Sequence, residues 1–141
     1  MSESPDIPAG FEPLFRSSPY IDMIGPLFSR GSGTTLILGL RAELKHCNAR
    51  GRVHGGVCSA LADVALGYAL SYSVDPPASL VTASLTLDFA GSAKAGDWLE
   101  TRVDVQRLGG RLGFANCYIW VSEQRIVRAS ATFAVVDSQP R

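Results

Sequence analysis

A single acidic side chain, Asp63, stands inside a long stretch of sequence that otherwise carries no charged residue. This stretch runs from Val53 to Val74 and is rich in Ala, Val, Leu and Gly. A buried ionised carboxylate is costly unless it is hydrogen-bonded or takes part in chemistry. No Lys or Arg lies close to it in the sequence to neutralise it. Asp63 is therefore the first candidate for a residue that does chemistry.

Polar and glycine residues directly precede this stretch. Asn48 and His54 bring side chains that donate or accept hydrogen bonds, and Gly55 and Gly56 follow at once. The first four N–H groups of a helix lack partners within the helix. Two glycines at a helix start leave such N–H groups uncovered, so the entrance to the apolar stretch is a second candidate region.

The apolar stretch itself predicts a helix from Gly56 to Leu70, because Ala and Leu occur throughout and apolar residues fall on every face. A helix that is apolar all round belongs to a core, which predicts full burial of Asp63. The segment is too short and too rich in Ala and Gly to span a membrane. The sequence Asp75-Pro76-Pro77 marks its exit, since proline cannot continue a helix.

Composition narrows the classes of protein that need to be considered. The chain has 141 residues, 46% of them hydrophobic, which predicts one compact domain over residues 1–141. The 13 basic and 13 acidic residues balance, so no overall field favours binding to nucleic acid or to an anionic membrane. The N-terminus lacks the basic start and apolar run of a secretory signal, and we expect a cytoplasmic protein.

The cysteines favour neither disulfides nor a metal site. Cys47, Cys58 and Cys117 are odd in number and form no close pair, which fits a reducing compartment. His46, Cys47, His54 and Cys58 lie close in sequence, but structural zinc sites use tight pairs in two separated knuckles. We therefore expect no metal and no cofactor.

After the helix the hydrophobic period changes from helical to two, which predicts strands. From Leu80, the apolar residues at odd positions up to Phe89 alternate with polar ones, which places Thr82 on the polar face. Three more strands are predicted, and together the four suggest an antiparallel meander. The predicted ranges are 99–105, 112–121 and 126–136, with turns at 96–97, 109–110 and 123–124.

Upstream of the helix the pattern predicts shorter elements. A helical segment is expected over 19–25, and two strands over 26–30 and 34–40 flank the Gly31-Ser32-Gly33 turn. The first ten or so residues are expected to be flexible. The order of strands, one long helix and further strands is typical of an α+β fold in which a helix packs on an antiparallel sheet.

The combination of these features resembles a known family, the hotdog-fold acyl-CoA thioesterases of the phenylacetate-degradation (PaaI-like) type. The resemblance covers nearly the whole chain after the first 15 or so residues. It rests on Asn-x5-His-Gly-Gly entering the helix, on an acid two turns further on, and on the later strands and turns. The matching residues at the helix are Asn48, Gly51, His54, Gly55, Gly56, Leu61, Asp63 and Ala65.

This resemblance implies hydrolysis of an aryl- or medium-chain acyl-CoA to the free acid and CoA. By analogy, the backbone N–H of Gly55 polarises the thioester carbonyl, and Asp63 attacks that carbonyl or activates a water to do so. Thr82 corresponds to a hydroxyl that holds the water. The plainer interpretation of Gly55 and Gly56 is that they permit a tight turn into the helix, which is compatible with the oxyanion role, and Thr82 could equally be an ordinary strand threonine.

The remaining site residues follow from the same resemblance. Asn48 and His54 correspond to side chains that contact the thioester region or brace the loop, and Gly56 and Arg111 to substrate-binding positions. Each has a plainer interpretation: Asn48 as a turn former, His54 as a structural residue and Arg111 as a solvated surface cation. The family also implies a homodimer with sites shared between subunits, and a homotetramer built as a dimer of dimers.

Other functions receive less support from the sequence. There is no Gly-x-Ser-x-Gly nucleophile elbow, phosphate-binding loop or dinucleotide fingerprint. A hotdog dehydratase or hydratase is the nearest enzymatic alternative, but the Asp-x4-His pattern of related hydratases is missing. A non-catalytic acyl-CoA-binding domain, or a scaffold without ligand, would gain nothing from Asp63.

Overall fold

The computed structural model describes residues 6–136, which form one sheet of seven strands and a long helix. The strands are β1 (Glu12–Pro13), β2 (Phe28–Arg30), β3 (Ile37–Arg41), β4 (Ser79–Phe89), β5 (Trp98–Leu108), β6 (Leu112–Val121) and β7 (Gln124–Val136). The α-helices are α1 (Pro19–Ile24) and α2 (Gly55–Ser71). Two 3-10 helices of one turn each are η1 (Gly33–Thr35) and η2 (Leu44–His46).

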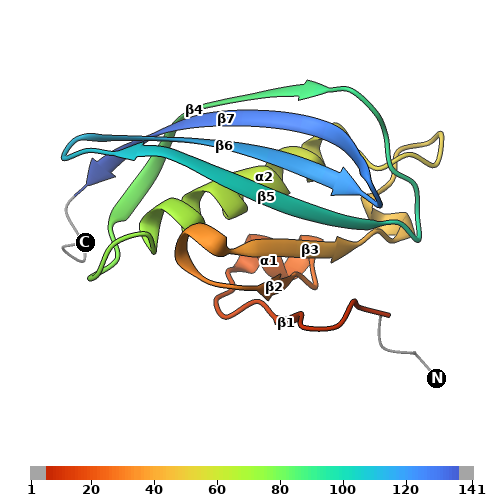
Figure 1. The fold of residues 1–141 in the computed structure, drawn as a ribbon. Coiled ribbons are helices and arrows are strands. Elements are labelled where there is room, and N and C mark those ends of the chain that lie inside the picture. Colours follow the sequence, from red (N-terminus) through yellow and green to blue (C-terminus); the bar gives the residue numbers. More distant parts are fainter. Residues whose placement is uncertain (1–5, 137–141) are drawn as a thin grey trace.

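The sheet curves around α2, as Figure 1 shows. Its strand order is β1-β2-β3-β5-β6-β7-β4, and every neighbouring pair is antiparallel. The core lies between the concave face of the sheet and one side of α2, where Leu61, Leu66 and Leu70 are fully buried. The α+β arrangement predicted from the sequence is confirmed. Neither α-helix in the described region is long and apolar enough to cross a membrane.

Most predicted elements appear close to their predicted positions. The helix α1 starts after Ser18, whose hydroxyl accepts a hydrogen bond from the Ile21 amide at 3.2 Å, and ends before Gly25. The strand predicted over 34–40 begins later, because the Thr35 side chain bonds to the backbone of Ser32 and closes the turn η1. The last turn lies at 122–123, one residue earlier than predicted.

The predicted four-strand meander is wrong for its first member. β4 pairs with β7 along its length, from Ser79 opposite Val136 to Phe89 opposite Val127, and it lies at the edge of the sheet. Residues 90–97 then cross to β5, which lies between β3 and β6. An alternating pattern indicates which face of a strand is buried, but it does not identify the neighbouring strand.

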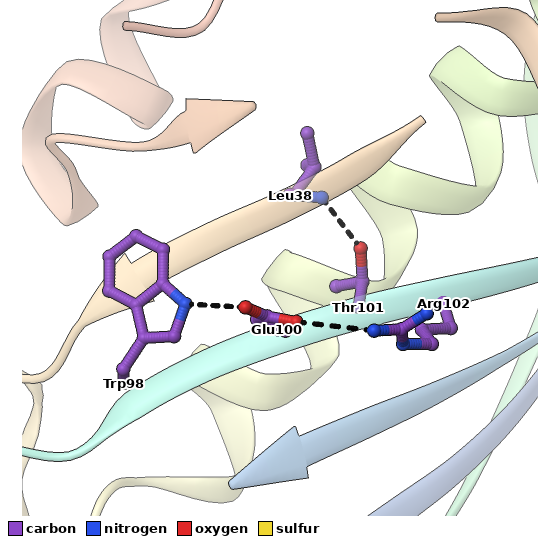
Figure 2. Close-up of polar contacts among 5 residues, drawn as sticks. All are labelled: Leu38, Trp98, Glu100, Thr101 and Arg102. Carbon is purple, nitrogen blue, oxygen red and sulfur yellow. Dashed lines mark hydrogen bonds and ion pairs between the residues drawn. The ribbon is translucent and has the colours of Figure 1, made fainter. Parts of the chain in front are cut away.

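The backbone pairing between β3 and β5 is short, and a hydrogen bond from a β3 amide to the Thr101 side chain extends it. Backbone pairing covers only Gly39 to Arg41, opposite Glu100 to Trp98. Beyond it, the Leu38 amide donates to the buried hydroxyl of Thr101 at 2.9 Å (Figure 2). Figure 2 also shows Glu100 between the Trp98 indole N–H and Arg102. Thr101 thus satisfies a backbone N–H that would otherwise be buried without a partner.

The segment before β1 was expected to be flexible, and part of it lies outside the described residues. Residues 1–5 belong to that part. Asp6 follows, and its carbonyl oxygen accepts a hydrogen bond from Nε of Arg41 at 2.9 Å. A contact with β3 therefore holds the chain at the first described residue.

Candidate active site

Asp63 lies in the middle of α2, and its carboxylate meets the hydroxyl of Thr82 on β4. Thr82 Oγ1 donates a hydrogen bond to Asp63 Oδ1 at 2.8 Å. Asp63 is half-buried rather than fully buried, so the expectation of a completely enclosed acid is wrong. The reason is that α2 buries only the side that faces the sheet, whereas Asp63, Val64, Gly67 and Tyr68 lie on a half-exposed side.

A β-bulge brings Thr82 to Asp63. Thr82 pairs with Phe133 and Ser84 pairs with Thr132, so Ala83 is an extra residue in β4. Such an insertion reverses the alternation of side chains along the strand. Thr82 therefore faces α2 together with Leu80 on one side of the bulge and Leu85 on the other. The prediction that Thr82 lies on the polar face is wrong, because strict alternation through Ala83 does not hold.

The N-terminus of α2 carries accessible backbone donors. The amides of Gly55 and Gly56 donate no hydrogen bond within residues 6–136, and both residues are exposed. His54 is the N-cap, with an exposed side chain that does not cap the helix, and its amide donates to the His46 carbonyl oxygen at 2.9 Å. The dipole of α2 adds partial positive charge at this point. Gly55 and Gly56 could therefore bind a carbonyl oxygen that develops negative charge.

Phe89 is a neighbour of Gly55 that is not predicted from the sequence. A β-carbon at residue 55 would lie 3.2 Å from Cζ of the Phe89 ring. This ring, at the end of β4, is 53% exposed. A larger residue at position 55 would therefore push against an aromatic side chain as well as cover the helix amides. The alternation of β4 had indicated only that Phe89 is apolar.

Asn48 organises the loop that leads to α2. Its side-chain Oδ1 accepts hydrogen bonds from the amides of Arg50 at 2.9 Å and Arg52 at 3.1 Å. The Asn48 amide also donates to the Arg52 carbonyl oxygen at 2.7 Å. These contacts make Asn48 a turn former. They leave its side-chain NH₂ group without a hydrogen bond among the described residues.

The predicted residues form two separate groups within one chain. Asn48, His54, Gly55 and Gly56 lie at the entrance to α2, and Asp63 and Thr82 lie further along it. Gly55 and Asp63 are eight positions apart, which at 1.5 Å per residue is about 12 Å along the helix axis. One thioester carbonyl cannot contact both groups of the same chain.

Arg111 lies away from the helix entrance. It precedes β6, and its carbonyl oxygen accepts a hydrogen bond from Val135 at 2.8 Å near the end of β7. Two residues later, the backbone of Gly113 lies against the side chain of Leu70, in the last turn of α2. The Arg111 side chain is exposed. It therefore lies by the C-terminal end of α2, whereas Gly55 lies at the N-terminal end.

A cavity of about 450 Å³ opens beside Asp63. Its walls come from the half-exposed side of α2, the start of β4, one residue of β7 and the segment before α1. The lining residues are Arg16, Ser17, Ser18, Asp63, Val64, Gly67, Tyr68, Ser71, Tyr72, Pro77, Ala78, Ser79, Leu80, Thr82 and Phe133. Most of these residues are not predicted from the sequence. Gly67, four residues after Asp63, and Tyr68, four residues after Val64, could have been found from helical spacing.

The cluster His46, Cys47, His54 and Cys58 is not arranged as a metal site. His46 is buried, its Nδ1 accepts from the Glu43 amide at 2.9 Å, and its Nε2 donates to the Ile24 carbonyl oxygen. Burial raises the pKa of the Cys58 thiol to about 11. Within residues 6–136, no three His, Cys, Asp or Glu side chains lie together as metal ligands would. His46 and Cys58 act as parts of the core.

Comparison with known proteins supplies the family. The family described as "Thioesterase superfamily" matches residues 50–128, which include Asp63, Thr82 and the start of α2. A protein of Pseudomonas aeruginosa named "Putative esterase PA0474" is 47% identical over 129 residues, covering 91% of this chain and 96% of that protein.

Solved structures share the fold at lower identity. The PaaI protein of Escherichia coli, from the phenylacetic acid degradation operon, superposes with a TM-score of 0.77 at 19% identity, over 85% of this chain and 86% of that one. Zebra fish thioesterase superfamily member 2 gives a TM-score of 0.78 at 22% identity, over 84% and 88%. These matches confirm the expected hotdog fold: an antiparallel sheet wrapped around one long helix.

Proposed function

Because the chain belongs to the thioesterase superfamily, we propose that it hydrolyses an acyl-CoA thioester to a free acid and CoA. A water molecule adds across the bond between the acyl carbon and sulfur, and the thiol of CoA leaves. The observation that carries this proposal is the Asp63–Thr82 hydrogen bond at the edge of a cavity, on a helix whose first two amides donate no hydrogen bond within residues 6–136. The superfamily supplies the reaction class, and the CoA ester is our extension of it.

In this proposal Asp63 is the reacting acid. Its carboxylate attacks the acyl carbon or removes a proton from a water that does so, and Thr82 positions that water or the carboxylate. The second oxygen of Asp63, Oδ2, accepts no hydrogen bond within the described part of the chain and is available for either role. The alternative, a binding domain without catalysis, leaves a half-buried carboxylate beside the bound acyl group without a use.

Gly55 polarises the thioester carbonyl in the same proposal. Its backbone N–H points from the start of α2, where the helix dipole stabilises the oxyanion of the tetrahedral intermediate. Gly56 and His54 line the approach to this point. Asn48 holds the loop through Arg50 and Arg52 and so fixes the position of Gly55.

Two copies of the chain are needed to complete each site, because about 12 Å separate Gly55 from Asp63 along one helix. We propose a homodimer in which Asn48, His54 and Gly55 of one subunit face Asp63 and Thr82 of its partner, and a tetramer of two such dimers. The edge strand β4 supports this arrangement. Among the described strands it has a neighbour on one side only, so its other side is unpaired over 11 residues, and an unpaired edge readily pairs with another chain.

The remaining features of the proposal concern cofactors, phosphate contacts and compartment. The mechanism requires no metal or other cofactor. Arg111 has an exposed side chain that could reach a CoA phosphate of a substrate bound between subunits. The three cysteines are free, which fits a reducing compartment and a cytoplasmic enzyme.

The proposal is tested by measuring release of free thiol from a panel of acyl-CoAs that includes acetyl, hexanoyl, decanoyl and phenylacetyl esters. We expect steady turnover of at least one ester, with equal amounts of thiol and free acid. Turnover of none would contradict the function. Release of water from 3-hydroxyacyl-CoA, or its addition to enoyl-CoA, would indicate the dehydratase or hydratase alternative.

A further inference from the structure

Gly67 occupies an unfavourable position for a glycine, in the interior of α2 and one turn after Asp63. Glycine is the least favourable residue in a helix interior after proline. A glycine at such a place usually permits close packing or leaves space for something else. Gly67 also lines the cavity beside Asp63 and Thr82.

Close packing does not require this glycine. A β-carbon at residue 67 would meet only the Phe133 ring, with Cε1 at 3.5 Å and Cζ at 3.8 Å, which are ordinary van der Waals distances. Gly113 gives the contrast, because a β-carbon there would lie 2.5 Å from Cδ2 of Leu70. An alanine would therefore fit at position 67 as far as the described residues are concerned.

Because Gly67 has no side chain, part of the cavity beside it stays open. Gly67 is four residues after Asp63, or about 6 Å further along the axis, and Phe133 faces it from β7. An acyl group whose carbonyl carbon meets Asp63 would extend over this point if it runs along α2. At the far end Phe15 packs against Tyr68 and Tyr72, with ring centroids 5.5 and 5.3 Å apart.

We propose that Gly67 sets the size of the acyl group that the site accepts. This inference rests on the proposed thioester hydrolysis and adds a residue that determines its specificity. With glycine at this position, an apolar acyl group longer than acetyl runs along α2 in the cavity, over Gly67 and beside the Phe133 ring, and extends toward Tyr68. A methyl group at residue 67, in contact with the Phe133 ring, would fill part of the cavity at this point and leave the space next to Asp63 unchanged.

The test compares wild type with Gly67→Ala on acetyl-CoA and hexanoyl-CoA. A steric misfit of one methyl group in an apolar pocket changes kcat/KM by roughly 10-fold or more. We expect that loss for hexanoyl-CoA, with the value for acetyl-CoA within about twofold of wild type. Gly110→Ala is the matched control, because a β-carbon there meets nothing within 4 Å and residue 110 lies outside the cavity. It should change neither rate.

A second substitution tests the steric cause. Phe133→Leu removes ring atoms that face residue 67, so the double variant Gly67→Ala/Phe133→Leu should recover part of the rate for hexanoyl-CoA. The thermal midpoint of Gly67→Ala should be no lower than that of wild type, since alanine favours helices. Unfolding of this variant, an equal loss for both esters, or no loss for either would overturn the proposal.

Binding of non-hydrolysable thioethers separates this inference from the proposed function. S-hexyl-CoA and S-ethyl-CoA are titrated into both proteins by calorimetry. Weaker binding of the hexyl compound alone by Gly67→Ala supports the inference even if wild type hydrolyses no ester, in which case only the function fails. Equal binding of both thioethers by the two proteins, or no binding of the hexyl compound by wild type, overturns the inference.

Discussion

Thr82 Oγ1 donates its hydrogen bond to Asp63 Oδ1 at 2.8 Å, across the gap between the edge strand and the helix. A hydroxyl has one proton to donate and two lone pairs, so Thr82 retains lone pairs that can accept from water. The interaction therefore fixes one carboxylate oxygen and leaves the other free. A carboxylate held this way can act on a bound substrate without first reorienting.

Replacing Asp63 by Asn tests whether this carboxylate does the chemistry. Asparagine keeps the size of the side chain and can still accept from Thr82, but it is neither a useful base nor a nucleophile. We expect thioester turnover to fall by about 10²-fold or more, the usual scale for a positioned acid or base, with fold and oligomer unchanged. Asp104→Asn, on an exposed position of β5, should keep wild-type activity. Turnover near the wild-type rate in Asp63→Asn would remove Asp63 from the mechanism.

Substitutions of Thr82 measure the part that its hydroxyl plays. Thr82→Ala removes the hydrogen bond to Asp63, yet water can still enter the site, so we expect a loss of kcat of about tenfold. Thr82→Ser keeps a hydroxyl and should recover most of the rate. Equal losses in the two variants would indicate that the methyl group matters, rather than the hydrogen bond.

The fold was largely predictable, because hydrophobic period reports local structure directly. The helix over Gly55–Ser71 and the strands β5, β6 and β7 follow from it. The pairing of β4 with β7 does not follow from the hydrophobic period, since the connections across the whole sheet decide which strands are neighbours. The half-exposure of Asp63 was missed for a similar reason. A helix that is apolar on every side is expected to be buried on every side, but the sequence does not tell whether the same chain or a second subunit covers each side.

The candidate site was predictable only through resemblance to a family. Spacing alone brings Asn48, His54 and Gly55 to one end of the helix. Contact between Asp63 and Thr82 depends on the bulge at Ala83, which alternation does not reveal. The cavity combines residues from four parts of the chain, so its walls required the three-dimensional structure.

Removal of metal should leave activity unchanged, because the proposed mechanism uses only a carboxylate, a hydroxyl and backbone N–H groups. We expect the same hydrolysis rate before and after dialysis against EDTA, and elemental analysis without a stoichiometric metal. A rate that EDTA abolishes and zinc restores would instead assign a metal to the site and require a different mechanism.

The buried thiols predict a loss of stability at high pH. Burial raises the pKa of Cys58 to about 11 and that of Cys117 to about 12, from 9.0. Above pH 9 the unfolded chain loses these protons while the folded chain keeps them, so the free energy of unfolding falls as pH rises. This stability is fully present below pH 9 and is lost between pH 9 and about 12. The maximal slope is about 1.4 kcal/mol per pH unit for each thiol.

The measurement is urea unfolding of wild type and of the variant Cys58→Ala/Cys117→Ala from pH 8 to pH 10.5. Other groups titrate in this range, so the difference between the two proteins carries the information. We expect the stability of the variant to fall less steeply with pH. Parallel curves would show that the two thiols ionise equally easily in both states.

Mixed dimers test whether two subunits share each site. Asn48→Ala removes two hydrogen bonds that hold the loop before Gly55, and Asp63→Ala removes the reacting carboxylate. Each homodimer should be nearly inactive, since all of its sites carry the substitution. In a dimer with one chain of each kind, one site carries both substitutions and the other carries neither.

Activity should therefore return on refolding the two variants together, to about half of a wild-type dimer for each mixed dimer if the sites act independently. The mixed dimers are isolated with different affinity tags on the two chains and assayed for thiol release, with wild-type chains refolded alongside. If each site belonged to one chain, every site would keep a damaging substitution. Mixed dimers that form but remain inactive, beside refolded wild type that recovers, would contradict the shared site.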